Sequence, residues 1–387
     1  MILKTIQPGR GARHWLCGGI LILCVLFSGT ACSPADPRAE SDAEIAPPFR
    51  MLLVGDPFAL SMERLRPRME AAMGFPIRIE LVGYNDGRRL ILLNGRDRES
   101  RYDLIALDIV WLGELTAQNL LRDLSQSFAA EADRFLPSAV AASSIDGRLY
   151  ALPVQPHAEL LWVRSDLLAS VQLPPPQTTE DVLTLARRLH APQQGQFGIA
   201  WNAQRGQPLG QTMAHLFAAF GQPLLTADQR QAAFETPLGL QAAEYAMALS
   251  TVAPPDILSM AWDQRTSRFA EGATSMTYGW GARAYITEQH PTSRVTGKVQ
   301  YLPAPHAPGA PPATPLGVWS LAIPANSARQ ERAIYFLQWF FQESVQRELV
   351  EVGHGSPSLM TLITDPEIQQ RHPVLRTLQE LHETEAL

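Results

Sequence analysis

Cysteine is scarce in this sequence of 387 residues. Only three occur, at Cys17, Cys24 and Cys32, and all of them stand in the first tenth of the chain. The rest of the chain can therefore form neither a disulfide nor a thiolate metal site. A chain of this length can bury enough apolar surface to fold without such cross-links.

Excess basic charge and familiar catalytic motifs are also missing. The chain has 32 Lys and Arg against 38 Asp and Glu, a formal net charge of −6 at pH 7, which argues against a nucleic-acid partner. It contains no Gly-x-Ser-x-Gly elbow, no Walker loop and no His-Glu-x-x-His motif, and its nine histidines show no ligand spacing. We therefore expect a protein that is not an enzyme and that has no metal or cofactor.

Long apolar runs are absent too. The run Trp15–Phe27 extends over about 13 residues, follows a basic segment, and precedes the small residues Ser28–Ala31 and then Cys32. This order predicts a signal peptide over residues 1–31. It resembles the bacterial lipoprotein box, which implies lipidation of Cys32 and a lipid anchor to the membrane. Gly29 stands where the box usually has an aliphatic residue, so cleavage by ordinary signal peptidase stays open.

What the sequence does contain is typical of a globular protein. Hydrophobic residues make up 46% of the chain and charged residues 18%. Its length exceeds that of one ordinary core and predicts two domains. Residues 32–47 are rich in Ala, Pro, Asp and Glu, have little to bury, and are predicted to form a flexible tether.

Short apolar segments alternate with helical patterns along the body. Met51–Gly55, Ile77–Val82 and Asp103–Asp108 are compact apolar runs, as parallel strands are when helices cover both faces of a sheet. Strands that alternate with helices at this spacing predict an α/β fold. Further predicted elements are a helix from Ser61 disturbed at Pro67, a helix capped by Thr178 or Thr179, a strand over 195–201, a helix over 241–251, strands over 273–278 and 318–323, and a helix that starts with a capping box at Ser327–Gln330.

The segment 146–167 is central to the predicted organisation. It begins with an Asp-Gly turn signal, Leu149–Val154 is predicted as a strand ended by a proline, and Leu160–Val163 as a second strand. The polar break between them contains Gln155 and His157. Two strands around such a break are expected where a chain leaves one sheet and enters another, so we predict a crossing between two lobes here.

Five blocks of sequence carry a family resemblance. They are Tyr102–Asp108 with Trp111 and Leu120–Leu124, then Asp146–Pro153 with Leu161–Leu167, then Thr178–Leu189 with Phe197–Ala200, then Phe269–Met276 with Trp280, and finally Gly317–Pro324 with Ala333–Phe340. All five occur in the family's order, over roughly residues 50–360. On these blocks the sequence resembles the extracellular solute-binding proteins of ABC importers, in particular the carbohydrate-type family that includes maltose-binding protein.

The resemblance implies a two-lobed periplasmic-binding-protein-like type II fold, with a hinge and an interlobe cleft. It implies the substrate-binding component of an ABC importer, which binds a small solute, a carbohydrate, by hinge closure and delivers it to a permease in the inner membrane. Such a protein is exported to the periplasm or cell envelope and acts as a monomer. Crossings near Gln155–Glu159, Gly272–Met276 and Leu321–Pro324 would give lobe 1 as 48–156 and 276–321, and lobe 2 as 157–275 and 322–387.

The ligand is expected beyond the carboxyl ends of strands and between the lobes. A sugar packs its C–H faces on aromatic rings and pairs its hydroxyls with polar side chains. The residues predicted to bind the ligand on these criteria are Asp108, Trp111, Gln155, His157, Trp201, Asn202, Tyr278, Trp280, Arg283 and Trp319. The resemblance adds Ser356, in a Gly-rich loop that would enter the cleft.

Each candidate also has a structural interpretation. Tryptophans fill α/β interfaces, and Asp108 could cap the helix after its strand. Gln155 and His157 could serve only the hinge backbone, and Arg283 could be a surface cation. The tryptophans expected only in the core or in surface packing are Trp162, Trp262 and Trp339.

Other functions stay open beside carbohydrate binding. A polyamine or an anionic solute is the first alternative, and Asp108 or Arg283 would then dominate the site. An exported enzyme or a sensor could be built on the same fold, and a structural lipoprotein is the last alternative.

Overall fold

The computed structural model describes residues 47–387. The predicted signal peptide 1–31, Cys32 and all but the last residue of the predicted tether 32–47 lie outside the described residues. In the described part of the chain, no helix combines the length and the hydropathy that a membrane span requires.

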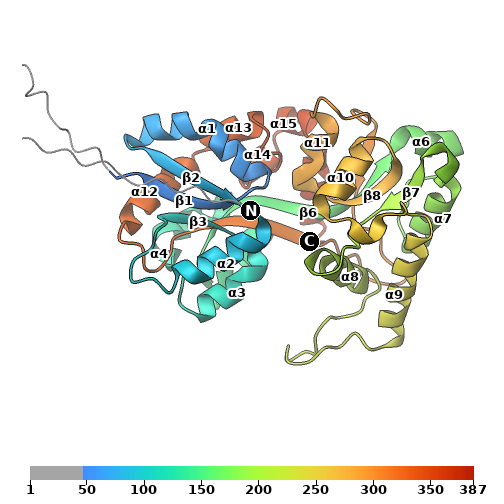
Figure 1. Ribbon diagram of the computed structural model, residues 1–387, viewed down its shortest axis with the longest axis horizontal. Helices are drawn as coiled ribbons and strands as arrows, with labels where there is room; N and C mark the ends of the chain where they lie inside the picture. Colours follow the sequence, from blue (N-terminus) through green and yellow to red (C-terminus); the bar gives the residue numbers. More distant parts are fainter. Residues whose placement is uncertain (1–46) are drawn as a thin grey trace, which may run out of the picture. The chain divides into compact units, whose positions relative to one another are not determined.

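Residues 47–387 form ten strands and sixteen α-helices (Figure 1). The strands are β1 (Phe49–Val54), β2 (Ile77–Val82), β3 (Leu104–Asp108), β4 (Ser144–Ile145), β5 (Arg148–Leu149), β6 (Leu152–Arg164), β7 (Phe197–Ala200), β8 (Thr274–Trp280), β9 (Val299–Leu302) and β10 (Leu316–Ala322). The helices are α1 (Pro57–Met73), α2 (Tyr84–Asn94), α3 (Ile109–Ala117), α4 (Ser125–Phe128), α5 (Pro137–Ala142), α6 (Ser165–Val171), α7 (Thr179–Leu189), α8 (Gln207–Ala219), α9 (Pro237–Ser250), α10 (Trp262–Ala270), α11 (Ala284–Glu288), α12 (Gln330–Phe340), α13 (Glu343–Glu351), α14 (Met360–Ile363), α15 (Pro366–Arg371) and α16 (Val374–Glu383).

The main sheet has the strand order β2-β1-β3-β10-β6-β8-β7, and β9 also pairs with β6. β1 runs parallel to both β2 and β3, as the apolar runs predict. In Figure 1, α1 lies on one side of these three strands and α2 and α3 on the other. β1 and β3 are mostly buried because helices cover both faces of this part of the sheet, whereas β2, at its edge, is mostly half-buried or exposed.

The prediction of two strands around a polar break is wrong, because both belong to one strand, β6. This strand has 13 residues, and it continues through Gln155 and Pro156. Pro156 pairs with Val318 of β10, and the register shifts between Trp319 and Ser320, which leaves Val154 as the extra residue of a β-bulge. The first half of β6 pairs with β10, while residues 159–164 pair with β8 and β9.

Two helix starts differ in how well the sequence predicted them. Thr178 caps α7 as expected: its hydroxyl accepts from the Asp181 N–H at 3.1 Å, and the Asp181 carboxylate accepts from the Thr178 N–H at 2.9 Å. The capping box predicted at Ser327 is wrong. The Ser327 hydroxyl accepts from the Arg329 N–H at 3.2 Å within a local turn, and α12 begins after Arg329.

α1 also differs from its prediction. It begins at Pro57 rather than at Ser61, because proline fits the first turn of a helix, where its missing N–H has no partner to lose. Pro67 lies inside α1 without ending it. Buried methionines on both sides of Pro67, Met62 and Met69, hold the two halves of the helix on the core.

The lobe boundaries 48–156, 157–275, 276–321 and 322–387 stay a prediction. β8 and β9 pair with residues 159–164 of β6, which favours a place for both strands in the second lobe. The chain would then return to the first lobe at β10 rather than at residue 276. α12 packs on β1, where the rings of Phe336 and Phe49 stack with their centroids 5.3 Å apart. That contact favours a place for α12 with the first lobe, whereas the prediction puts it in the second.

Gly198 allows β7 to lie close to α7. A methyl group at this position would lie 2.4 Å from the backbone carbonyl oxygen of Ala186, which cannot turn aside as a side chain could. We expect Gly198→Ala to lower the free energy of unfolding by about 1–3 kcal/mol. The matched control is Gly113→Ala in α3, where the position is exposed and no atom lies within 4 Å of the added methyl group. It should raise the free energy by about 0.5–1 kcal/mol, and equal effects of the two changes in urea unfolding would contradict this packing.

Candidate functional site

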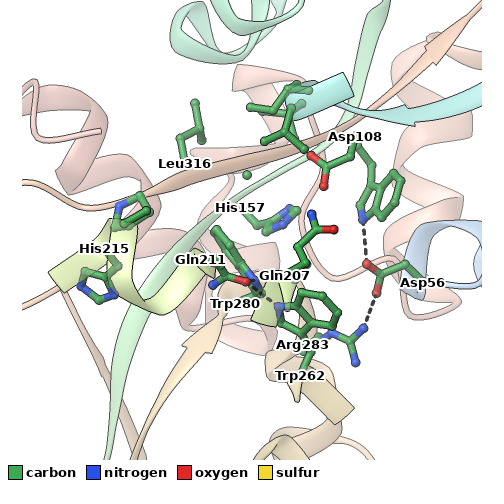
Figure 2. A pocket seen from close by; sticks show the side chains of 18 of the residues that line it. Asp56, Asp108, His157, Gln207, Gln211, His215, Trp262, Trp280, Arg283 and Leu316 are labelled. Atoms are coloured by element: carbon green, nitrogen blue, oxygen red, sulfur yellow. Dashed lines mark hydrogen bonds and ion pairs between the residues drawn. The ribbon is translucent and has the colours of Figure 1, made fainter. Parts of the chain in front are cut away.

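A pocket of about 980 Å³ lies between the carboxyl ends of β1, β2 and β3 on one side and helices α8 and α10 on the other (Figure 2). The end of β8, the strand β10 with the preceding residues 312–315, and the C-terminal residues 385–387 also line it. The polar and aromatic side chains that line it include Asp56, Tyr84, Asp108, His157, Gln207, Gln211, Trp262, Trp280, Arg283 and Trp319.

Three of these side chains follow the three parallel strands. Asp56, Tyr84 and Asp108 lie at or just beyond the ends of β1, β2 and β3, and parallel strands bring their carboxyl ends to one edge of the sheet. The Tyr84 hydroxyl donates to Oδ2 of Asp108 at 2.7 Å. The same hydroxyl accepts from Nε2 of Gln207 at 2.6 Å, so Tyr84 connects this edge of the sheet to α8.

Both carboxylate oxygens of Asp56 accept hydrogen bonds from neighbouring side chains. Its Oδ2 accepts from the Trp319 indole N–H at 2.6 Å, and its Oδ1 accepts from Nη2 of Arg283 at 3.1 Å. Arg283 also pairs with Asp263 at the start of α10. Burial opposes the charge of Arg283, but the two carboxylates more than offset this, so its pKa is raised. The charge of Arg283 is therefore already balanced inside the protein.

Aromatic rings cover both sides of the pocket. The Tyr84 ring lies 5.7 Å from that of Trp262 and 6.0 Å from that of Trp319, measured between centroids. His157 meets Trp280 edge to face at 4.9 Å. These flat surfaces suit the C–H faces of a ligand.

Two side chains of the wall, Asp108 and His157, offer hydrogen-bond acceptors to a ligand. Burial raises the pKa of Asp108 to about 6, although the Tyr84 hydroxyl partly offsets this. His157 is buried, which lowers its pKa, and its Nδ1 lies 2.8 Å from the Gln155 carbonyl oxygen. Because a carbonyl only accepts, we assign the proton of the neutral ring to Nδ1. Nε2 is then an acceptor.

The structure brings five of the predicted ligand-binding residues into the wall of the pocket. They are Asp108, His157, Trp280, Arg283 and Trp319. That any of them contacts a ligand stays a prediction.

Six other predicted residues are not among those that line the pocket. Trp111 packs beneath Tyr84, with ring centroids 4.9 Å apart. Gln155 donates to the backbone carbonyl of His354, and Ser356 donates to that of Pro156. The remaining three, all buried, are Trp201, Asn202 and Tyr278. Their burial favours the structural interpretation of all six, and their role in binding stays an untested prediction.

The sequence analysis missed five residues of the wall, which are Asp56, Tyr84, Gln207, Gln211 and Trp262. Asp56 and Tyr84 follow β1 and β2 as Asp108 ends β3, so the rule that selected Asp108 could have found both. Trp262 was expected only in packing. Gln207 and Gln211 lie on α8, and the sequence analysis predicted no helix over 207–219, so nothing marked the two glutamines. In the part of the chain that the structure describes, no three His, Cys, Asp or Glu side chains converge as metal ligands.

Comparisons with known proteins identify the family and agree with the fold. A model of the family described as "bacterial extracellular solute-binding protein" matches residues 69–347. The "Probable ABC transporter-binding protein" of Deinococcus radiodurans is 25% identical over 291 residues, 73% of this chain and 69% of its own length. The mannitol-binding protein of Pseudomonas aeruginosa is 28% identical over 253 residues, 62% of this chain and 56% of its own length.

A solved structure is also similar. The ABC transporter solute-binding protein of Agrobacterium radiobacter K84, in complex with ribitol, superposes with a TM-score of 0.82 at 26% identity, over 87% of this chain and 86% of that one. The likeness confirms the predicted α/β, two-lobed fold class.

The raised pKa of Asp108 predicts how stability changes with pH. Its ordinary pKa is 3.8 and its folded pKa about 6, so between these values the folded state binds more protons than the unfolded state. The contribution of Asp108 to stability therefore falls as pH rises from 4 to 7. Relative to wild type, Asp108→Asn should gain roughly 1–3 kcal/mol of unfolding free energy over this range. Urea unfolding at each pH measures the difference, and a difference that does not change with pH would contradict the burial of this carboxyl.

Proposed function

Because this chain belongs to the bacterial extracellular solute-binding proteins, we propose that it binds a neutral polyhydroxy compound, a sugar or a sugar alcohol, in the pocket described above. Members of this family bind solutes and are not enzymes, so the predicted class of function is confirmed. The family is extracellular or periplasmic. The nature of the solute is our proposal.

The balanced charge of Arg283 carries this proposal. Among residues 47–387, Arg283 is the only Arg or Lys that lines the pocket, and Asp56 and Asp263 both pair with it. A phosphate or carboxylate ligand would need a cation that is free to pair with it. The anionic alternative is therefore disfavoured.

A polyamine would find few carboxylates free to pair with it near Arg283, because Asp56 is occupied by Arg283 and Trp319, and Asp263 by Arg283. Asp108 would be mostly ionised at pH 7, since its pKa is raised only to about 6, so a polyamine stays the rival ligand in the test below. Hydroxyl groups, in contrast, can donate to Asp108 and to Nε2 of His157 while carbon atoms pack on Trp262 and Trp280. The relatives that carry mannitol in their name or ribitol in their structure support a compound of this kind.

We propose that binding closes a hinge. The hydrogen bond from Gln207 to Tyr84 and the ion pair of Arg283 with Asp56 join the edge of β1–β3 to α8 and to the turn after β8. We take the first lobe to contain β1–β3, β10 and the first half of β6, and the second lobe to contain β7–β9 and the second half. A ligand held by both sides would stabilise the closed state. The closed protein, acting as a monomer, would then deliver the ligand to an importer permease.

Ligand binding is tested by thermal unfolding of the purified protein with ribitol, D-mannitol, maltose, mannitol 1-phosphate and spermidine. A ligand at 100 times its dissociation constant adds about 2.7 kcal/mol of stability. We expect a neutral compound to raise Tm and the charged compounds to leave it unchanged. Stabilisation by the phosphate or the polyamine alone would overturn the proposal.

Two tryptophan variants provide the matched controls for that experiment. Trp280→Ala removes an aromatic wall of the pocket and should abolish the rise in Tm. Trp339→Ala removes a tryptophan that does not line the pocket, and it should keep the rise relative to its own unliganded Tm.

We propose, further, that residues 1–31 direct export and that Cys32 carries a lipid anchor. Cells fed a labelled fatty acid should incorporate the label into the wild type and not into Cys32→Ser. The variant should also leave the membrane fraction, because its anchor is absent. Label on the variant, or none on the wild type, would contradict the lipid anchor and favour ordinary cleavage.

A further inference from the structure

A buried ion pair lies behind the wall of the pocket. Glu159 of β6 and Arg265 of α10 are each about 1% exposed, and Nη1 of Arg265 donates to Oε1 of Glu159 at 2.6 Å. Neither residue lines the pocket. Any effect of this pair on a ligand must therefore pass through another side chain.

Two side chains of α8 line the pocket and lie against Glu159: Nδ1 of His215 lies 3.7 Å from Oε2 of Glu159, and Gln211 is the one that forms a hydrogen bond with it. Nε2 of Gln211 donates to Oε2 of Glu159 at 2.5 Å. Its Oε1 accepts from two indole N–H groups, that of Trp262 at 2.5 Å and that of Trp280 at 3.3 Å. Figure 2 shows Gln211 beside both tryptophans, in the wall of the pocket.

This chain of hydrogen bonds can run in only one direction. An ionised carboxylate only accepts and an indole N–H only donates, so the amide between them must point its nitrogen at Glu159 and its oxygen at the indoles. Burial opposes ionisation of Glu159, but Arg265, together with His215 and Gln211, more than offsets this, and the pKa of Glu159 is lowered. Arg265 thus keeps Glu159 in the state that fixes the amide of Gln211.

Stability alone is a poor explanation for this pair. Nε and Nη2 of Arg265 are buried without a hydrogen-bond partner among the described residues. Apolar residues often replace a buried ion pair with no loss of stability, because they avoid the cost of removing two charges from water. What the pair adds is a fixed direction for Gln211.

We propose that Glu159 and Arg265 are positioning residues for the ligand, which act through Gln211 to hold the Trp262 and Trp280 rings at fixed angles in the pocket. The inference rests on the proposed function, in which a sugar or sugar alcohol packs against these rings. It adds that two residues with no ligand contact set the affinity of the site.

The first test replaces both charges at once. Glu159→Met with Arg265→Met leaves no unpaired charge but removes the acceptor for Nε2 of Gln211. We expect ribitol to bind roughly tenfold more weakly by calorimetry, because the released amide no longer holds the rings. Urea unfolding of the same double variant separates this loss from a loss of folding.

The matched control keeps the acceptor and removes only the charges. Glu159→Gln with Arg265→Met retains a carbonyl oxygen that can accept from Gln211. Its affinity for ribitol should stay within about threefold of wild type, a difference below about 0.7 kcal/mol. Equal affinity of wild type and both double variants, or equal weakening of the two variants, would overturn the proposal.

Near-ultraviolet circular dichroism supplies a readout without any ligand. The indole bands should change in Glu159→Met with Arg265→Met and in Gln211→Met, which removes the shared acceptor but keeps the ion pair. They should stay close to wild type in the control. Unchanged indole bands in Glu159→Met with Arg265→Met and in Gln211→Met would overturn the positioning role even if ribitol binds. Absence of ribitol binding together with changed bands would instead point to failure of the proposed function alone.

Discussion

Glu159 lies at the point where β6 changes partners, and the structure around the pocket depends on how its buried charge is satisfied. Ala158 still pairs with Leu316 of β10, whereas Glu159 pairs with Trp280 of β8. The carboxylate of Glu159 binds Arg265 and Gln211 at this same point. One residue therefore joins the change of strand pairing to the wall of the pocket. A buried carboxylate without these partners would cost several kcal/mol, so the local arrangement is strongly constrained.

The one Arg or Lys that lines the pocket among residues 47–387 is neutralised before any ligand enters. Asp56, Arg283 and Asp263 neutralise one another in part, and Glu159 with Arg265 does the same behind the wall. The groups left for a ligand are rings and neutral or weakly acidic acceptors. Such a lining favours a compound whose polar atoms are hydroxyls, because a hydroxyl can leave water without carrying a full charge.

Local sequence rules predicted the elements of this fold, and non-local contacts explain where they failed. The apolar runs of β1–β3, the capping box at Thr178 and the position of Asp108 follow from short-range patterns. β6 was divided wrongly at Pro156, because the strand that pairs with this residue lies about 160 residues away. Gln211 could not be predicted, since its role arises only when α8 meets Glu159, Trp262 and Trp280 in space.

The structure of the protein in complex with a polyol that raises its Tm tests the central claim most directly. We expect ligand hydroxyls within hydrogen-bond distance of Asp108 and of Nε2 of His157, with carbon atoms against the Trp262 and Trp280 rings. The Gln211 amide should still join Glu159 to both indoles. A ligand bound outside this pocket, or one that displaces Asp56 from Arg283 to pair with the guanidinium, would contradict it.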